Sequence, residues 1–389
     1  MIESSAIPKR FYSLDALRGI AAIIVVLTHW PQFFFVSEKL SGSPISHGSS
    51  EFITTYLESK LPFYDVLFVA YKSGWLAVDL FFGLSGFIFY WLYAEKIKES
   101  ALTAWNFFIS RFSRLYPLHL LTLIWIVCVQ FVLQHATNAS FFFFDHNDPF
   151  EFILHLLLIS SWGVGNHVSF NLPIWSVSVE IAMYTMFFVL CRFFPVRSLV
   201  LAIVSAIGLF VVFRVNSQLG HGIASFFLGG CTYHVYEWIV KTSRTKAALF
   251  YLSIVTALLW GMAILSDYRH WDFLGSVPFL WRYTLLPTAL IFQVTILTLA
   301  LAETLRGTLG KRLMVLGDIS YSVYLLHFPL QISALTMAIY LGISREVFYS
   351  YYAFFGFFAV VLTLAALSHY YFERPVQRYM RKAWQSPVS

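Results

Sequence analysis

The chain has 389 residues, of which 59% are hydrophobic, 19% are aromatic and only 12% are charged. In a typical globular domain about a quarter of the residues are charged, so this composition excludes an ordinary soluble protein. The mean hydropathy of +0.70 points the same way. The net charge of +6 is best explained by basic residues on cytoplasmic loops of a membrane protein, and nucleic acid is not an expected partner.

Ten apolar segments are long enough to cross about 30 Å of hydrocarbon as helices. These segments lie near residues 14–36, 74–94, 115–134, 173–193, 197–214, 221–240, 247–266, 284–304, 315–341 and 347–371. The predicted fold class is therefore an all-α polytopic bundle of about ten transmembrane helices. It forms a single transmembrane domain over 1–389, with no separate soluble domain.

Most lysine and arginine residues fall at one side of these predicted spans, which places both termini in the cytoplasm. Residues 37–73 and 135–172 then become long outer loops that can shape access for a large polar substrate, and 150–161 is too short for a span and is predicted to be interfacial or re-entrant. The cysteines lie in apolar runs without metal-ligand spacing, so neither a metal site nor a disulfide framework is predicted. A multi-pass protein of a cell membrane, bacterial by expectation, follows.

The first span, LDALRGIAAIIVVLTHW at 14–30, keeps Asp15, Arg18 and His29. Arg18 and His29 are eleven residues apart and so share one helix face, about 16 Å apart along the axis. Asp15 lies one turn from Arg18 and is predicted to pair with it. Either Arg18 snorkels and His29 is bonded inside the bundle, or both open onto one cavity with an anion-binding rim and a titratable base further in. The shared face favours the cavity.

RFSRLYP at 111–117 places Arg111 and Arg114 one turn apart at the inner side of the membrane. Anchoring at the membrane surface explains one such arginine well. Two of them can instead grip phosphate groups through forked, charge-assisted hydrogen bonds. The spacing alone does not decide between these roles.

Further polar residues interrupt three other spans. Asp79 heads the helix of DLFFGLSGF and either binds a sugar hydroxyl or caps the helix, whereas NLPIWSVSVEIAMY at 171–184 brings Trp175, Ser178 and Glu180 into the membrane. An acid inside a span is a functional candidate, so Glu180 is predicted to face the bundle interior. LGDISYSVYLLHFPL at 316–330 adds Tyr324 and His327 as i,i+3 neighbours on a hydrogen-bonded inner wall.

Taken in this order, together with FERP near the C-terminus, these stretches resemble the acyltransferase-3 family of integral-membrane proteins. That family O-acylates surface polysaccharides, peptidoglycan and some secondary metabolites. The resemblance implies an acyl-CoA co-substrate, a catalytic histidine in an Arg-x10-His arrangement and an Arg-x-x-Arg pair, which fall on Arg18 and His29 and on Arg111 and Arg114. The fused extracytoplasmic domain of longer members is lacking, so transfer is expected within the bundle.

The resulting hypothesis is an O-acyltransferase in which His29 takes the proton of an acceptor hydroxyl and Arg18, Arg111 and Arg114 hold the CoA phosphates. The acceptor is a glycan or lipid-linked saccharide, the acyl group is acetyl by default, and a covalent acyl-histidine remains an alternative route. Supporting or acceptor-binding roles are expected for Asp15, Asp79, Trp175, Ser178, Glu180, Tyr324 and His327. The rival interpretation is a transporter or flippase that uses His29 and Glu180 as a proton relay.

Overall fold

The computed structural model describes residues 7–34, 60–137, 147–165, 169–194, 198–215, 217–269 and 287–385. Every regular element within these ranges is helical. Nine of the helical stretches in the described ranges are long and apolar enough to cross a membrane. The prediction of an all-α polytopic bundle is confirmed.

The inner part of the bundle contains α1, α5, α8, α10, α13 and α15. Their bounds are Tyr12–His29, Ala77–Lys98, Ile174–Phe193, Gln218–Lys241, Phe292–Arg306 and Ser320–Tyr340. Buried Phe, Leu, Ile and Val side chains from these helices form one continuous cluster. This cluster fixes the positions of the polar side chains that the same helices carry.

Helix α10 accounts for the difference between nine apolar stretches and the ten predicted spans. It is rich in glycine and polar residues and packs between α5 and α9. The contact with α5 is so close that a Cβ on Gly86 would lie 1.8 Å from the carbonyl oxygen of Phe226. Small residues allow this kind of backbone approach within membranes.

The outer helices expose apolar side chains, as lipid-facing helices do. They are α6, α9, α11 and α16, with bounds Ala104–Thr137, Ser198–Val215, Thr245–Arg269 and Tyr351–Leu367. Helix α6 begins eleven residues before the predicted span 115–134 and contains Pro117. Helix α16 continues through a π-helical turn, Ser368–Glu373, into α17, Arg374–Trp384, so the helix runs beyond residue 371, where the predicted span 347–371 ends.

Two short helices lie within the loops that the sequence predicts. Helix α4, Tyr64–Ser73, leads through a 3-10 turn into α5, so the loop prediction 37–73 is wrong for its last part. Helix α7, Pro149–Leu156, has eight residues, which agrees with the prediction that 150–161 is too short to span. The remainder of both predicted loops lies largely outside the described residues.

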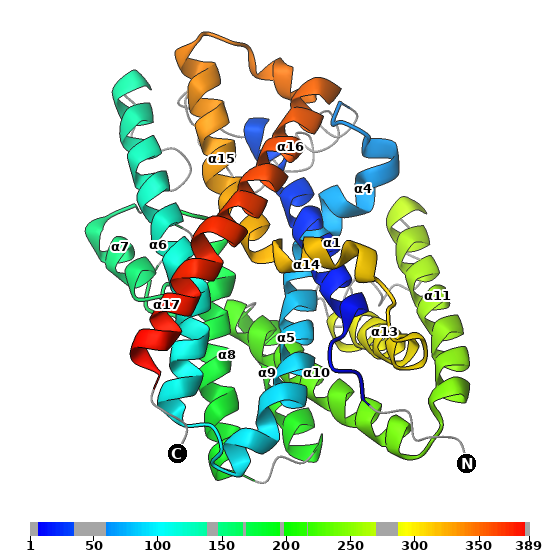
Figure 1. Cartoon of the computed structure of the whole chain (residues 1–389). Helices are drawn as coiled ribbons and strands as arrows, with labels where there is room; N and C mark the ends of the chain where they lie inside the picture. Colours follow the sequence, from blue (N-terminus) through cyan, green and yellow to red (C-terminus); the bar gives the residue numbers. More distant parts are fainter. Residues whose placement is uncertain are drawn as a thin grey trace.

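The last elements bring distant parts of the chain together. A 3-10 turn, Lys311–Leu313, and α14, Met314–Asp318, precede α15, and a 3-10 turn, Arg345–Tyr349, leads into α16. A π-helical turn, Pro287–Ile291, precedes α13. In Figure 1 the two chain ends lie at the same end of the bundle, with α1 rising from that end and α17 returning to it. Their cytoplasmic location stays a prediction.

Candidate active site

Two neighbouring cavities lie beside the first half of α1. The inner cavity, of about 160 Å³, lies between α1, α5, α6, α8 and α15. The charged cavity, of about 400 Å³, lies beside it and is lined by Lys9, Arg10, Asp15, Asp318 and Arg374 among others. Arg18 and Arg114 line both cavities. The two cavities are therefore adjacent compartments joined at these arginines.

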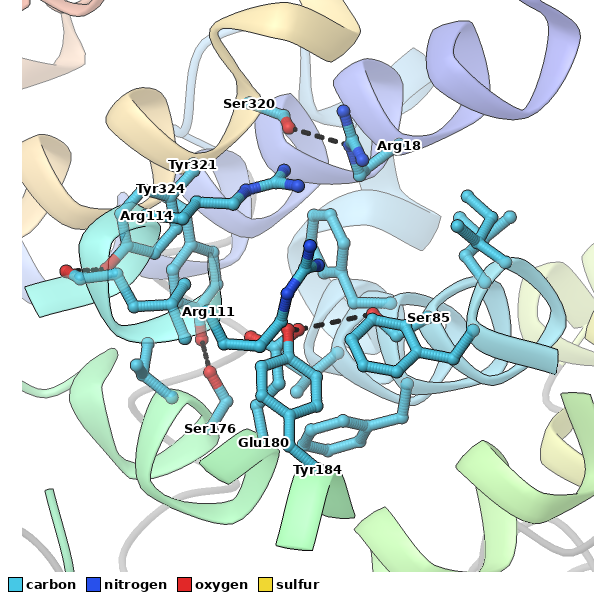
Figure 2. A pocket seen from close by; sticks show the side chains of 18 of the residues that line it. Arg18, Ser85, Arg111, Arg114, Ser176, Glu180, Tyr184, Ser320, Tyr321 and Tyr324 are labelled. Carbon is cyan, nitrogen blue, oxygen red and sulfur yellow. Dashed lines mark hydrogen bonds between the residues drawn. The ribbon is translucent and has the colours of Figure 1, made fainter. Parts of the chain in front are cut away.

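Three arginines supply the positive charge of the inner cavity. Figure 2 shows the guanidinium groups of Arg18, Arg111 and Arg114 pointing towards the same region, from α1 and α6. This region is where an anionic group would meet the most donors. The sequence prediction that these residues act together is compatible with their placement.

Arg18 is held in place by the break between α14 and α15. Its Nη2 donates to the carbonyl oxygen of Gly317 at 2.7 Å, and its Nε donates to Ser320 Oγ at 3.1 Å. The close approach of α1 and α14 requires Gly317, because a Cβ there would lie 2.3 Å from the carbonyl oxygen of Asp15. Arg18 therefore both joins two elements and lines both cavities.

Asp15 has a nearer partner than the predicted one. Arg10 Nε lies 2.7 Å from Asp15 Oδ2, and Arg10 Nη2 lies 2.7 Å from Asp318 Oδ1, whereas Arg18 Nη2 is 3.5 Å from Asp15 Oδ1. Burial works against the charge on Arg10, but the two carboxylates raise its pKa above the ordinary value. The predicted pair of Asp15 with Arg18 is therefore present, and Asp15 has a second, shorter ion pair with Arg10, which precedes the helix.

Arg111 and Arg114 differ in their contacts although they are one turn apart. Arg111 donates to the Tyr93 hydroxyl at 2.7 Å and lies over the rings of Phe89 and Tyr93. Arg114 is half-buried and makes no recorded hydrogen bond or ion pair in the described part of the chain. Within the described residues, the N–H donors of Arg114 are therefore without the protein acceptor that Arg111 has in Tyr93.

Helix α8 contributes a line of polar side chains spaced four residues apart. Ser176, Glu180 and Tyr184 all line the inner cavity. The Glu180 carboxylate accepts hydrogen bonds from the Tyr184 hydroxyl and, at 3.3 Å, from Ser85 on α5. Glu180 thus faces the bundle interior, as predicted, in a cavity that also holds arginines.

Tyr324 closes the far side of the inner cavity. Its hydroxyl lies 2.7 Å from Ser176 Oγ and donates to the carbonyl oxygen of Pro173 at 3.1 Å. The ring of Tyr324 is also 6.1 Å from the ring of His327, one turn further along α15. Tyr324 therefore contacts both the cavity and the histidines beyond it.

His29 and His327 form a pair beyond Tyr324, whose ring contacts His327. His29 Nδ1 lies 2.8 Å from His327 Nε2, and the rings are nearly parallel, with an interplanar angle of 12°. His327 is 1% exposed, whereas His29 retains partial exposure. Arg18 and His29 both bind α15, so the predicted shared face is confirmed. His29 lines neither of the two cavities, however, so the expectation of one common cavity is not met by them.

The other predicted residues occupy different surroundings. Asp79 is 3% exposed and accepts from Thr288 and Ser225 while contacting His221 Nδ1 at 3.1 Å, so it does not cap its helix. Ser178 accepts from the backbone of Ser161 and holds that turn.

Trp175 packs edge-on against Phe82, at a centroid distance of 6.3 Å, and does not line either cavity. Within the described ranges, no group of at least three His, Cys, Asp or Glu side chains is placed to hold a metal ion.

Several residues of the inner cavity are not among those predicted from the sequence. Ser176 and Tyr184 lie four residues before and after Glu180, so helical spacing from that acid is a signal that identifies both. Ser85 lies between Gly83 and Gly86, in a run of small residues that is typical of close helix packing and so gives no signal of a polar site. Tyr93 carries no comparable local signal, because its relevance depends on the contact between α5 and α6.

Residues 11–370 match the model of a family described as an acyltransferase domain. Acyltransferase MdmB of Streptomyces mycarofaciens is 29% identical over 340 residues, which cover 82% of the chain and 78% of MdmB. Peptidoglycan O-acetyltransferase OatA of Listeria monocytogenes is 27% identical over 300 residues, which cover 67% of the chain but 45% of OatA.

A putative acetyltransferase of Acidianus two-tailed virus is 24% identical over 287 residues, covering 70% of the chain and 78% of that protein. No solved structure matches the chain. The family match extends over nearly all the described helices and includes Arg18, His29, Arg111, Arg114 and His327. The chain therefore belongs to the acyltransferase-3 family and is a multi-pass membrane acyltransferase.

Proposed function

We propose that the protein transfers an acyl group, acetyl by default, from acyl-CoA on the cytoplasmic side to a hydroxyl group of a glycan or lipid-linked saccharide on the other side. The observation that carries this proposal is the pair of adjacent cavities that share Arg18 and Arg114, the inner of which is lined by Tyr324, whose ring contacts His327 of the histidine pair. Such an arrangement suits a donor with a charged head and a slender arm.

The charged cavity is suited to the phosphate groups of CoA. Lys9, Arg114 and Arg374 line it, and no side chain or backbone group among the described residues is recorded as a hydrogen-bond or ion-pair partner of Arg114 that would compete with a phosphate. Guanidinium groups bind phosphate oxygens through paired hydrogen bonds. With the phosphates held there, the pantetheine arm would extend past Arg18 into the inner cavity.

The inner cavity is suited to the thioester end of the donor. Its wall combines aromatic rings with hydroxyl groups from Ser176 and Tyr324, next to the Glu180 carboxylate. Because Tyr324 lies between this cavity and His327, its ring has to move for the thioester and His29 to meet.

His29 is the proposed general base. It takes the acceptor proton, the resulting alkoxide attacks the thioester carbonyl, the C–S bond breaks, and the CoA thiolate recovers the proton. An acyl-histidine intermediate is the alternative route, since imidazole is also a nucleophile. Isolation of a labelled protein after single-turnover mixing without acceptor distinguishes the covalent route from direct transfer.

The primary test replaces His29 by glutamine and by alanine in membranes supplied with labelled acetyl-CoA and a glycan acceptor. His135→Gln is the matched control, because His135 is exposed and bonds only to its own helix backbone. We expect loss of acyl transfer by about 10²-fold or more in the His29 variants, the range for a general base, and none in the control. Wild-type turnover by folded His29→Gln protein would refute the assignment.

A transporter or flippase remains testable with the same membranes. Reconstituted liposomes should consume acetyl-CoA and yield an acylated acceptor without net saccharide flux. Proton-coupled flux without thioester consumption would contradict the proposed activity. For the location, we propose a bacterial cytoplasmic membrane, where acyl-CoA is available on one side and surface glycans are assembled on the other.

A further inference from the structure

The histidine pair is held by more contacts than a single hydrogen bond. His29 is the last residue of α1, and His327 lies inside α15. Besides the contact between the rings, Gln331 Nε2 donates to the backbone carbonyl of His29 at 2.7 Å. Helix α15 therefore fixes both the backbone and the ring of His29.

The hydrogen-bond partners of His327 show which ring nitrogen in the histidine pair donates and which accepts. His327 Nδ1 lies 3.2 Å from the carbonyl oxygen of Val323, which only accepts hydrogen bonds, so Nδ1 carries the hydrogen. In a neutral imidazole the other nitrogen is then an acceptor, and His327 Nε2 accepts from His29 Nδ1–H at 2.8 Å. This leaves the lone pair of the neutral His29 ring on Nε2, the atom without a recorded partner in the described residues.

The opposite assignment is unfavourable. If His327 carried its hydrogen on Nε2, its Nδ1 lone pair would face the lone pairs of the Val323 carbonyl. No carboxylate is recorded within hydrogen-bond distance of either ring in the described part of the chain. The nearest titratable side chain with a recorded ring contact is Tyr324, which contacts His327.

We propose that His327 is a positioning residue that fixes the tautomer of His29 so that Nε2 is the base. The inference rests on the proposed function. When His29 Nε2 takes the acceptor proton, both ring nitrogens of His29 carry hydrogens, and Nδ1–H still donates to His327 Nε2. When the CoA thiolate leaves, it removes the Nε2 proton and restores the neutral pair. A buried imidazole thus takes the place that a carboxylate holds in the serine hydrolase triad.

A pair of substitutions at one position separates hydrogen bonding from packing. His327→Phe keeps a flat ring against His29 but removes the acceptor, whereas His327→Gln keeps an amide oxygen able to accept from His29 Nδ1. We expect kcat to fall at least 100-fold in His327→Phe with an unchanged KM for acetyl-CoA. His327→Gln should retain activity within about tenfold of wild type, because an accepting atom remains.

The pH–rate profile gives a readout that loss of packing alone does not move. An amide oxygen stabilises the His29 imidazolium less than an imidazole nitrogen, so the ascending limb of kcat/KM should move to lower pH in His327→Gln. Acetyl-CoA binding and thermal unfolding in detergent identify variants that are folded. If His327→Phe does not fold, the His327→Gln profile decides, and an unchanged limb overturns the proposal.

Two further outcomes also overturn it. One is wild-type turnover by folded His327→Phe protein, and the other is an equal loss in both variants while acetyl-CoA binding is normal. Either result, together with an inactive His29→Gln variant, would leave the proposed function intact and remove His327 alone. Activity in His29→Gln would instead remove the proposed base.

Discussion

Replacing Arg114 by alanine removes the guanidinium that lines both cavities and has no recorded protein partner among the described residues. If the phosphates of the donor bind there, the substitution deletes a charge-assisted hydrogen bond. Such bonds contribute about 1.5–3 kcal/mol. At about 1.4 kcal/mol per tenfold, the affinity for acetyl-CoA should fall by about 10-fold to 150-fold.

Arg111→Ala is the matched control, because it removes the same charge from the same helix. The Arg111 guanidinium already donates to Tyr93 at 2.7 Å and lies over two aromatic rings. Its loss should therefore lower the thermal unfolding temperature more than Arg114→Ala does, and change acetyl-CoA affinity less. The cation–π contacts alone are worth about 0.5–2 kcal/mol.

The assay measures acetyl-CoA binding by isothermal titration calorimetry in detergent and KM in membranes, with thermal unfolding on the same samples. A folded Arg114→Ala protein with wild-type affinity would refute placement of the phosphates at this residue. Equal losses of acetyl-CoA affinity in the two variants would show that Arg111 and Arg114 contribute equally to donor binding, which would contradict the predicted difference between them.

Three other substitutions test the packing and the buried polar groups. Gly86→Ala should abolish recovery of monodisperse protein on size-exclusion chromatography, because the added Cβ would lie 1.8 Å from an α10 carbonyl oxygen. Gly261→Ala is the control, because a Cβ there has no neighbouring atom within 4 Å. Normal recovery of Gly86→Ala would contradict the close crossing of α5 and α10. Burial, followed by the charge of a neighbouring histidine, lowers the pKa of His155 to about 3, so the unfolded chain takes up a proton as pH falls below about 6.5 while the folded chain does not. The free energy of unfolding should therefore drop by about 2 kcal/mol between neutral pH and pH 5. His155→Gln should flatten this pH dependence. Asp79→Ala should lower the unfolding temperature, because it removes the carboxylate that contacts His221, at a cost of about 1.5–3 kcal/mol in the free energy of unfolding. A second change, His221→Leu, should recover part of this loss. No recovery in the double variant would show that the Asp79–His221 contact does not stabilise the fold.

The helical spans are predictable because long apolar runs have few alternatives in a membrane. The predicted span 173–193 differs by one residue from α8, Ile174–Phe193, where Pro173 marks the start. The errors occur where apolarity does not define the helix. Helix α6 begins at Ala104 because helical sequence extends beyond the apolar run, and α4 lies in the stretch 37–73 that the sequence predicts to be a loop.

The site was predictable at the level of local spacing. Glu180 faces the interior, and Arg18 and His29 share a face, because a helix repeats every 3.6 residues. The partners of these residues come from parts of the chain that spacing cannot relate. His29 and His327 are 298 residues apart in sequence, and Arg10 Nη2 reaches Asp318 across 308 residues. The distinction between Arg111 and Arg114 likewise depends on Tyr93 from another helix.

Helix α1 contacts α15 at two positions along its axis, near Arg18 and at His29. Arg18 donates to Ser320 and His29 contacts His327, so the proposed anion-binding residue and the proposed base, which both lie on α1, are each held against α15. Eleven residues of helix set their separation at about 16 Å. Under the proposed function a donor has to span this length, so a truncated thioester that lacks the nucleotide would contact only one of the two groups and should react more slowly than the full donor.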